Sequence, residues 1–383
     1  MGQRDLGGAD GDHDQSADLA LGRALHRLHG GGAEPAGRRA ARHARSADAA
    51  QHGQAAVTAA FELRGLTAAV PGEKGAVRLV EEVSLHVRAG ETLAVVGESG
   101  SGKTVTFTSA LGLLPKPGRV IAGEALLEGE DLLKLSPEAL RRRRGARIGM
   151  VFQDPLTGLN PVFRVGEQIA EVLRAHLPIS RREARERAVA LLARVQIPDP
   201  ARRVDDYPHQ FSGGMRQRVL IAMAIALGPR VLIADEPTTA LDVTVQAQVL
   251  DLLGDLRDAE GMAMVLITHD LGVVARQADR VAVMYAGRVV ETGTVAEVFA
   301  APRHPYTISL FRSIPDVEAP AGTTLAPIAG SPPDPARRPV GCAFAPRCFA
   351  VSDAAGCRSA RPLLIGAGHE AACHRQGAAE LAA

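Results

Sequence analysis

The sequence predicts an α/β fold built on a parallel sheet, followed by a small cysteine-containing C-terminal extension. Short apolar runs, typical of buried strands, occur at residues 92–96, 231–234, 264–268 and 281–285. Stretches with helical spacing separate these runs, and such alternation is typical of parallel sheets. After Arg303 the chain becomes rich in proline and contains all four cysteines, so a separate module is expected at residues 303–383.

Composition indicates a globular protein with a sizeable core. The 383 residues are 46% hydrophobic and 23% charged, and the net charge of +1 gives no reason to expect a nucleic-acid partner. No apolar run reaches the roughly 18–20 residues of a membrane helix, and no secretory signal opens the chain. We therefore expect a protein of the cytoplasm, where thiols stay reduced, that reaches a membrane only through partners.

The remaining segments divide the chain at about residue 58. Residues 1–58 contain few large apolar side chains, which predicts either a disordered extension or a start codon assigned too far upstream. Residues 59–302 are expected to form the main domain. Within it, residues 79–87 alternate like a strand, and residues 167–196 have the composition and spacing of a helical insert.

Residues 97–104 match the phosphate-loop pattern G-x-x-x-x-G-K-[ST] between an expected strand and an expected helix at 105–114. The glycines allow backbone amides to curl around phosphate oxygens, where the following helix N-terminus favours negative charge. Lys103 is expected to reach the β- and γ-phosphates of ATP, and Thr104 to ligate Mg²⁺. A Gly-rich turn without a ligand is the structural alternative. The candidate nucleotide-binding residues here are Gly97, Ser99, Gly100, Gly102, Lys103 and Thr104.

Polar residues follow three other apolar runs. Asp235 ends the run at 231–234 and is expected to hold Mg²⁺, while Glu236 is the candidate general base for an attacking water. Alternatively, the two acids only begin a loop before Pro237. Gln153 and His269 each end an apolar run where a γ-phosphate contact is wanted, and Gln153 is also a candidate Mg²⁺ ligand.

Ser212, Gly213 and Gly214 open an apolar helix that is expected to reach residue 227. Such a helix start can bind an anion, although it can also be an ordinary N-cap. The chain has only one phosphate loop, so a second phosphate-binding helix start would serve a nucleotide held by another subunit.

The order of these motifs, with Asp242 following Glu236, resembles that of ABC transporter ATPase domains over about residues 60–300. The resemblance implies a P-loop NTPase with a RecA-like core, a helical subdomain and an antiparallel β-subdomain. It implies ATP and Mg²⁺ as ligands and a head-to-tail dimer in which Asp242 helps to couple the two sites. It also implies that the Gln153 loop and the helical insert receive a coupling helix of a membrane subunit. One departure is Val77, because the family usually stacks adenine on an aromatic residue there.

Residues 150–161, Phe211, Met215 and residues 303–307 resemble the dipeptide/oligopeptide/nickel uptake subfamily. This resemblance implies import of short peptides, driven from the cytoplasmic face of the membrane. The implied partners are a second, non-identical ABC ATPase, two transmembrane permease subunits and an extracytoplasmic solute-binding protein. The same architecture could import nickel or another small solute. A soluble ABC ATPase acting on DNA or ribosomes is the alternative from another class, although the tandem domain or coiled coil expected of it is missing.

The four cysteines form a cluster in the sequence, because only 5, 8 and 15 residues separate Cys342, Cys348, Cys357 and Cys373. Four thiolates suit zinc or an iron–sulfur cluster, and no C-x-x-C pair supports a zinc ribbon. The subfamily resemblance implies a [4Fe–4S] cluster, while zinc and free thiols remain alternatives. Arg347, beside Cys348, is expected to cap or pair locally.

Overall fold

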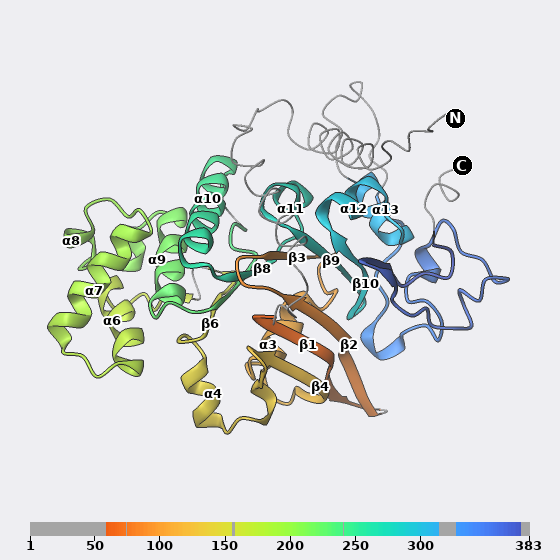
Figure 1. The fold of residues 1–383 in the computed structure, drawn as a ribbon, viewed down its shortest axis with the longest axis horizontal. Helices are drawn as coiled ribbons and strands as arrows, with labels where there is room; N and C mark the ends of the chain where they lie inside the picture. The colour runs from red at the N-terminus through yellow and green to blue at the C-terminus, as the bar shows by residue number, and fades with distance from the viewer. Residues whose placement is uncertain (1–58, 74, 155–157, 240, 314–326, 377–383) are drawn as a thin grey trace, which may run out of the picture.

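The structure is a computed structural model that describes residues 59–73, 75–154, 158–239, 241–313 and 327–376. The expectation for residues 1–58 therefore lies outside the described residues, as do positions 155–157 of the Gln153 loop and Ala240. Figure 1 shows a central sheet with a small second sheet below it, a helical part on one side and the C-terminal region on the other.

The large sheet has the strand order β11-β12-β10-β9-β3-β8-β7-β6 among the described residues. Its parallel part, from β9 to β6, confirms the predicted α/β class. The four strands predicted for this part begin and end within one residue of their observed bounds. These strands and the remaining parallel strand are β3 (Thr92–Val96), β7 (Val231–Asp235), β8 (Ala263–Ile267), β9 (Arg280–Tyr285) and β6 (Ile148–Val151).

Strand β3 lies inside the parallel part, with β8 on one side and β9 on the other. All five of its residues are buried, which explains its continuous apolar run, since a strand covered on both faces has no polar side. Helices α10 (Val243–Glu260) and α11 (Leu271–Gln277) connect β7 to β8 and β8 to β9. The phosphate loop leaves the carboxyl end of β3, where ligands of such sheets bind.

The smaller sheet is antiparallel, with the order β2-β1-β4-β5, and confirms the β-subdomain implied by the resemblance. Helix α3 (Lys103–Ala110), which follows the phosphate loop, packs against it, and the rings of Phe61 and Phe107 lie 6.5 Å apart. Helix α3 ends four residues earlier than predicted, before Gly112 at φ 63°. The strands are β1 (Phe61–Gly72), β2 (Gly75–Val87), β4 (Arg119–Leu127) and β5 (Glu130–Asp131), followed by η1 (Leu132–Lys134) and α4 (Pro137–Arg143).

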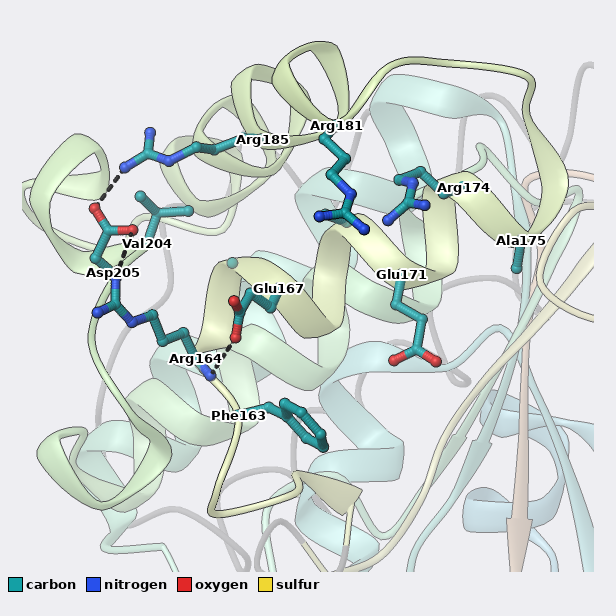
Figure 2. A pocket seen from close by; sticks show the side chains of 12 residues that line it. Phe163, Arg164, Glu167, Glu171, Arg174, Ala175, Arg181, Arg185, Val204 and Asp205 are labelled. Atoms are coloured by element: carbon teal, nitrogen blue, oxygen red, sulfur yellow. Dashed lines mark hydrogen bonds and ion pairs between the residues drawn. The ribbon is translucent and has the colours of Figure 1, made fainter.

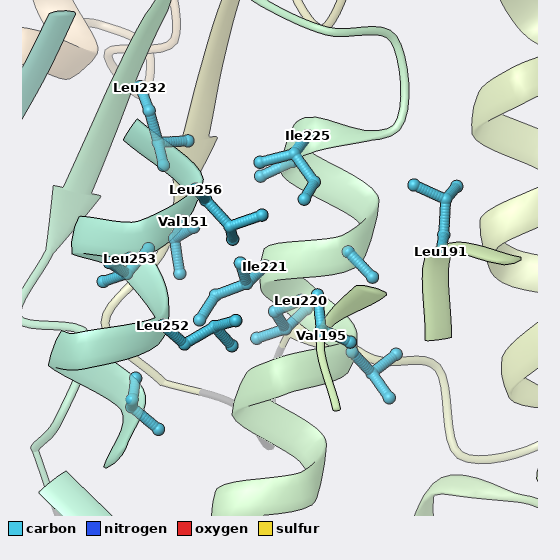
Figure 3. Packing of buried hydrophobic residues seen from close by; sticks show 14 of the residues in the cluster. Val151, Leu191, Val195, Leu220, Ile221, Ile225, Leu232, Leu252, Leu253 and Leu256 are labelled. Atoms are coloured by element: carbon cyan, nitrogen blue, oxygen red, sulfur yellow. The ribbon is translucent and has the colours of Figure 1, made fainter. Parts of the chain in front are cut away.

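The helical insert lies between β6 and β7 and packs on α10. Figure 3 shows its core, where Leu220, Ile221 and Ile225 meet Leu252 and Leu256 of α10. Because this core joins the helical part to the sheet, it fixes the start of α9 relative to β7. The elements of the insert are α6 (Val165–His176), α7 (Arg181–Arg194), α8 (Pro200–Arg203), η2 (Pro208–Gln210) and α9 (Gly213–Ile225).

The C-terminal region extends the large sheet. Strand β12 (His369–Ala371) pairs antiparallel with β10 (Arg288–Thr294), and β11 (Ile365–Ala367) pairs with β12. The side chains of this region also share a hydrophobic cluster with strands β3 and β9. The other elements are α12 (Val295–Ala300), α13 (Pro305–Arg312), η3 (Pro335–Arg337) and η4 (Ala345–Arg347).

Within the described ranges, none of the helices has both the length and the apolar character that crossing a membrane requires.

Candidate nucleotide-binding site

The phosphate loop curves tightly between β3 and α3, and Lys103 lies within it. The Lys103 ammonium donates hydrogen bonds to the carbonyl oxygens of Gly97, at 2.7 Å, and Glu98, at 3.1 Å. The side chain is buried, and burial lowers its pKa, while the nearby carboxylates of Glu236 and Asp235 oppose that shift. A cation with these neutral partners inside the loop is placed to exchange carbonyl contacts for phosphate oxygens.

Two glycines of the loop are required by its geometry. A Cβ atom at Gly97 would lie 2.2 Å from the carbonyl oxygen of Met284, and φ there is 150°. At Gly102, φ is 102° and a Cβ would lie 2.9 Å from Val80 Cγ1. Both positions therefore exclude side chains. Ser99 and Gly100, which lie between these two glycines, are exposed.

Thr104 and Asp235 lie together at the carboxyl end of the sheet. The Thr104 hydroxyl donates to Asp235 Oδ1 at 3.1 Å, and burial of Asp235 raises the pKa of its carboxyl group. A hydroxyl and a desolvated carboxylate are oxygen ligands that suit Mg²⁺, directly or through its water shell. These two residues therefore fit the expected cation.

Glu236 follows Asp235 and contacts Gln153 and His269, the two other polar residues predicted for this site. Its Oε2 atom accepts hydrogen bonds from Gln153 Nε2 at 3.0 Å and from Thr239 Oγ1 at 2.9 Å, and His269 Nδ1 lies 3.4 Å away. The backbone of Glu236 has φ 44°, a left-handed conformation that a non-glycine residue adopts at a cost. Sequence reasoning missed Thr239, which had no pattern of its own.

Ser212, Gly213, Gly214 and Asp242 lie at the starts of α9 and α10, apart from the contacts described above. Ser212 and Asp242 are the N-caps of α9 and α10, and no hydrogen bond or ion pair of the described residues joins either one to the phosphate loop. A Cβ at Gly214 would lie 2.3 Å from Val245 Cγ1, so the two helix starts pack closely. Val77 lies half-buried in β2 and pairs with Val70 of β1.

The prediction that Arg347 caps or pairs locally was wrong. Arg347 does not pair locally: its guanidinium donates to both carboxylate oxygens of Glu98, at 2.6 and 2.9 Å. Tyr306 also reaches Glu98, whose backbone N–H donates to the tyrosine hydroxyl at 2.8 Å. Two residues of the C-terminal region therefore hold a residue of the phosphate loop more than 200 positions earlier in the chain.

The four cysteines are free thiols in one region, where Cys342 N donates to Cys357 O at 2.9 Å. Burial raises the pKa of Cys342 and Cys348, and that of Cys373 to about 11, with smaller contributions from the neighbouring cysteines. Across the described residues, however, no group of three or more potential ligands is close enough to hold a metal ion. In this arrangement the thiols do not fit the expected iron–sulfur cluster or zinc.

A groove opens on the helical insert, away from the phosphate loop. Figure 2 shows its lining from α6 and α7, and its volume is about 700 Å³. Charged side chains line it, including Arg174 and Glu171 of α6 and Arg181 of α7. Phe163, which also lines the groove, is 51% exposed, and the preceding Val162 is 71% exposed.

Comparison with known proteins relates the chain to two described families. Residues 80–239 match the ABC transporter family, and residues 290–357 match the family described as oligopeptide/dipeptide transporter, C-terminal region. The chain is 54% identical to the "Oligopeptide transport ATP-binding protein OppD" of Bacillus subtilis over 76% of this chain and 82% of that protein. It is 51% identical to the "Probable peptide ABC transporter ATP-binding protein y4tR" of Sinorhizobium fredii, over 82% and 94% of the two chains.

Solved structures agree with this relationship. The "Dimeric structure of a post-hydrolysis state of the ATP-binding cassette MJ0796 bound to ADP and Pi" matches with a TM-score of 0.55 and 29% identity, over 61% of this chain and 98% of that one. The structure of cbiO1 from Clostridium perfringens matches with a TM-score of 0.55 and 28% identity, over 63% and 91%.

Proposed function

The chain belongs to the family of ABC transporter ATP-binding proteins, and on this premise we propose that it binds and hydrolyses ATP to drive the import of di- and oligopeptides. The observation that carries the proposal is the convergence of Lys103, the Thr104–Asp235 pair and Glu236 at the carboxyl end of one parallel sheet. A phosphate-binding cation, a cation site and a general base are the parts that phosphoryl transfer to water requires.

In the proposed reaction, Glu236 accepts a proton from a water molecule as the water oxygen bonds to the γ-phosphorus. The bond from that phosphorus to the bridging oxygen breaks, and ADP and phosphate leave. Gln153 and His269, which contact Glu236, orient the water and the γ-phosphate. Lys103 and the amides of the loop neutralise the phosphates. Mg²⁺, held by Thr104 and Asp235 with Gln153 as a further candidate ligand, would supply additional charge stabilisation.

Among the described residues, no hydrogen bond or ion pair joins Ser212 to the phosphate loop of its own chain, which supports a head-to-tail dimer. In this arrangement, Ser212, Gly213 and Gly214 of one ATPase subunit close on the nucleotide held by the other, and Asp242 couples the two sites. The N-terminus of α9 offers backbone N–H groups to the phosphates. A similar cassette has been solved as a dimer bound to ADP and phosphate, which supports a dimer for this chain. We propose that the partner is a related, non-identical ATPase. We also propose that the side chain of Val77 packs against the adenine ring.

The groove on the helical insert is the proposed docking site for a coupling helix of one permease subunit. Exposed Phe163 and Val162 would be covered there, and Arg174, Arg181 and Glu171 would pair with charges on the permease. Because Phe163 and Arg164, which line the groove, follow the Gln153 loop in the chain, docking there would respond to the state of the nucleotide site. The chain would thus act on the cytoplasmic face of the membrane through its partners.

Peptide import is tested by reconstituting the chain with its partner ATPase, the two permease subunits and the solute-binding protein in liposomes. Hydrolysis of ATP is expected to increase several-fold when a peptide-loaded binding protein is added, because differential binding between transporter states shifts their populations. The ligand-free binding protein is the matched control. Stimulation by nickel but not by peptides would replace the proposed cargo, and no hydrolysis at all would reject the ATPase.

The finer proposal for the cysteines is that Cys342, Cys348, Cys357 and Cys373 move closer together on binding a [4Fe–4S] cluster. Protein purified without oxygen is then expected to contain about four iron and four sulfide per chain, and a Cys357→Ser variant to lose most of both. Treatment with a chelator should remove the visible absorbance of the cluster. Stoichiometric zinc would replace the cluster in the proposal, and neither metal above trace would leave the free thiols seen here.

A further inference from the structure

Glu98 places a carboxylate inside the phosphate loop, one residue after Gly97. In a site for a highly charged nucleotide, an unpaired carboxylate would repel the phosphates and compete for Lys103. The structure pairs this carboxylate with a cation from the C-terminal region. Both guanidinium Nη atoms of Arg347 donate to it, at 2.6 and 2.9 Å, in the bidentate geometry that gives the strongest ion pairs.

Arg347 is fixed in place by more than this ion pair. Its side chain is only 4% exposed, and its Nε atom donates to the carbonyl oxygen of Ala329 at 2.8 Å. The guanidinium lies over the rings of Tyr285 and Phe344, at 5.8 and 6.0 Å from their centroids. A guanidinium held on several sides loses little entropy when it binds Glu98, so the pair is preorganised.

Tyr306 holds the main chain of the same loop residue. Its hydroxyl accepts from Glu98 N at 2.8 Å, and its ring is fully buried against Tyr285 at a centroid distance of 4.6 Å. His304 caps the helix that carries Tyr306, because its Nδ1 atom accepts from Tyr306 N at 3.0 Å. Burial lowers the pKa of His304 to about 4, so that the ring stays neutral and can accept this bond.

The buried carboxylate of Glu291 anchors this turn to the large sheet. It accepts from the backbone N–H groups of Arg303 and His304, at 2.7 and 2.9 Å, and its Oε1 atom lies 2.7 Å from His369 Nε2. The path from β10 to the phosphate loop therefore consists of buried, hydrogen-bonded side chains. Because few of these side chains can move independently, a shift of β10 would also shift the phosphate loop.

We propose that Arg347 and Tyr306 are positioning residues of the nucleotide site, through which the C-terminal region sets the affinity of the phosphate loop for ATP. Arg347 neutralises Glu98 and leaves the charge of Lys103 to the phosphates, while Tyr306 fixes the backbone of the loop. This inference rests on the proposed function, because it assumes that residues 97–104 bind the nucleotide. It gives the C-terminal region a role in the ATPase that requires no metal.

The test measures equilibrium binding of the non-hydrolysable ATP analogue AMP-PNP, with Mg²⁺, to the full chain. Arg347→Met is expected to weaken binding about 10-fold, because it leaves the Glu98 carboxylate unpaired beside the phosphates. Adding Glu98→Gln to that variant is expected to restore binding to within about threefold of the wild type, since it removes the repelling charge. Arg347→Lys should be intermediate, and Tyr306→Phe should weaken binding about threefold.

Arg358→Met is the matched control, because Arg358 forms an exposed ion pair with Asp353 in the same region. In the reconstituted transporter, Arg347→Met should raise the KM for ATP by a similar factor and change kcat by less than about twofold, a split that loss of folding would not produce. If Arg347→Met does not fold, Arg347→Lys and Tyr306→Phe carry the test.

Two outcomes separate this inference from the proposed function. If the wild type binds AMP-PNP and Lys103→Ala does not, while Arg347→Met and Arg347→Lys bind like the wild type, only the inference is wrong. Failure of Glu98→Gln to rescue Arg347→Met would likewise reject the inference and leave the nucleotide site in place. If the wild type and Lys103→Ala fail equally to bind AMP-PNP, the nucleotide site itself is rejected.

Discussion

Replacing Glu236 with glutamine is expected to reduce ATP hydrolysis by about 10²- to 10⁴-fold, the usual contribution of a general base. Glutamine keeps the size of the side chain and can still bond to Gln153 and Thr239, but it cannot accept a proton from water. Binding of ATP should stay within about twofold of the wild type, and a closed, ATP-bound dimer should accumulate. Phosphate release by the reconstituted transporter and the size of the ATP-bound complex measure the two effects.

Glu138→Gln is the control for this substitution, because Glu138 is exposed on α4 and its ion-pair partners in the described part of the chain are the surface arginines Arg141 and Arg142. It should hydrolyse ATP at the wild-type rate. Undiminished hydrolysis by the Glu236 variant would show that another group accepts the proton. A variant that loses ATP binding together with hydrolysis would instead indicate that Glu236 supports the fold of the site.

Lys103→Ala should weaken ATP binding by roughly 30- to 5,000-fold, because removing one partner of a buried, hydrogen-bonded charge pair costs about 2–5 kcal/mol. Burial removes water from the Lys103 ammonium, which lowers its pKa. The ammonium is therefore stabilised strongly by contacts with phosphate oxygens. Isothermal titration of the full chain with AMP-PNP and Mg²⁺ would measure the loss.

Lys134→Ala provides the comparison, since Lys134 is 72% exposed and its ion-pair partners among the described residues are Glu124 and Asp131. Its removal should change stability by less than about 1 kcal/mol and leave nucleotide binding unchanged. Equal affinity in the Lys103 variant and the wild type would mean that the loop does not bind the phosphates as proposed.

The C-terminal region is part of the main fold and contacts the phosphate loop. Strand β12 extends the sheet from which the phosphate loop leaves, and Arg347 and Tyr306 contact that loop. Cys348 directly follows Arg347, so a change in the position of Cys348 would move a residue next to the partner of Glu98.

The sequence alone determined the parallel core and the parts of the site that depend on local pattern. Buried strands such as 92–96 show as continuous apolar runs, and the phosphate loop shows because glycines, Lys103 and Thr104 must follow at fixed spacing. The acidic pair Asp235-Glu236 could be located because it ends one of those runs. These features depend on residues that are close together in the sequence, so they can be predicted from it.

Only the tertiary structure decided which distant groups meet. Thr239 joins Gln153 and His269 on Glu236 because three separate segments end at the same edge of the sheet. The pairing of Arg347 with Glu98 crosses 249 positions, and strand β12 joins β10, although neither contact has a local signal in the sequence. A side chain's partner depends on how the layers pack, which the spacing of residues along the chain does not specify.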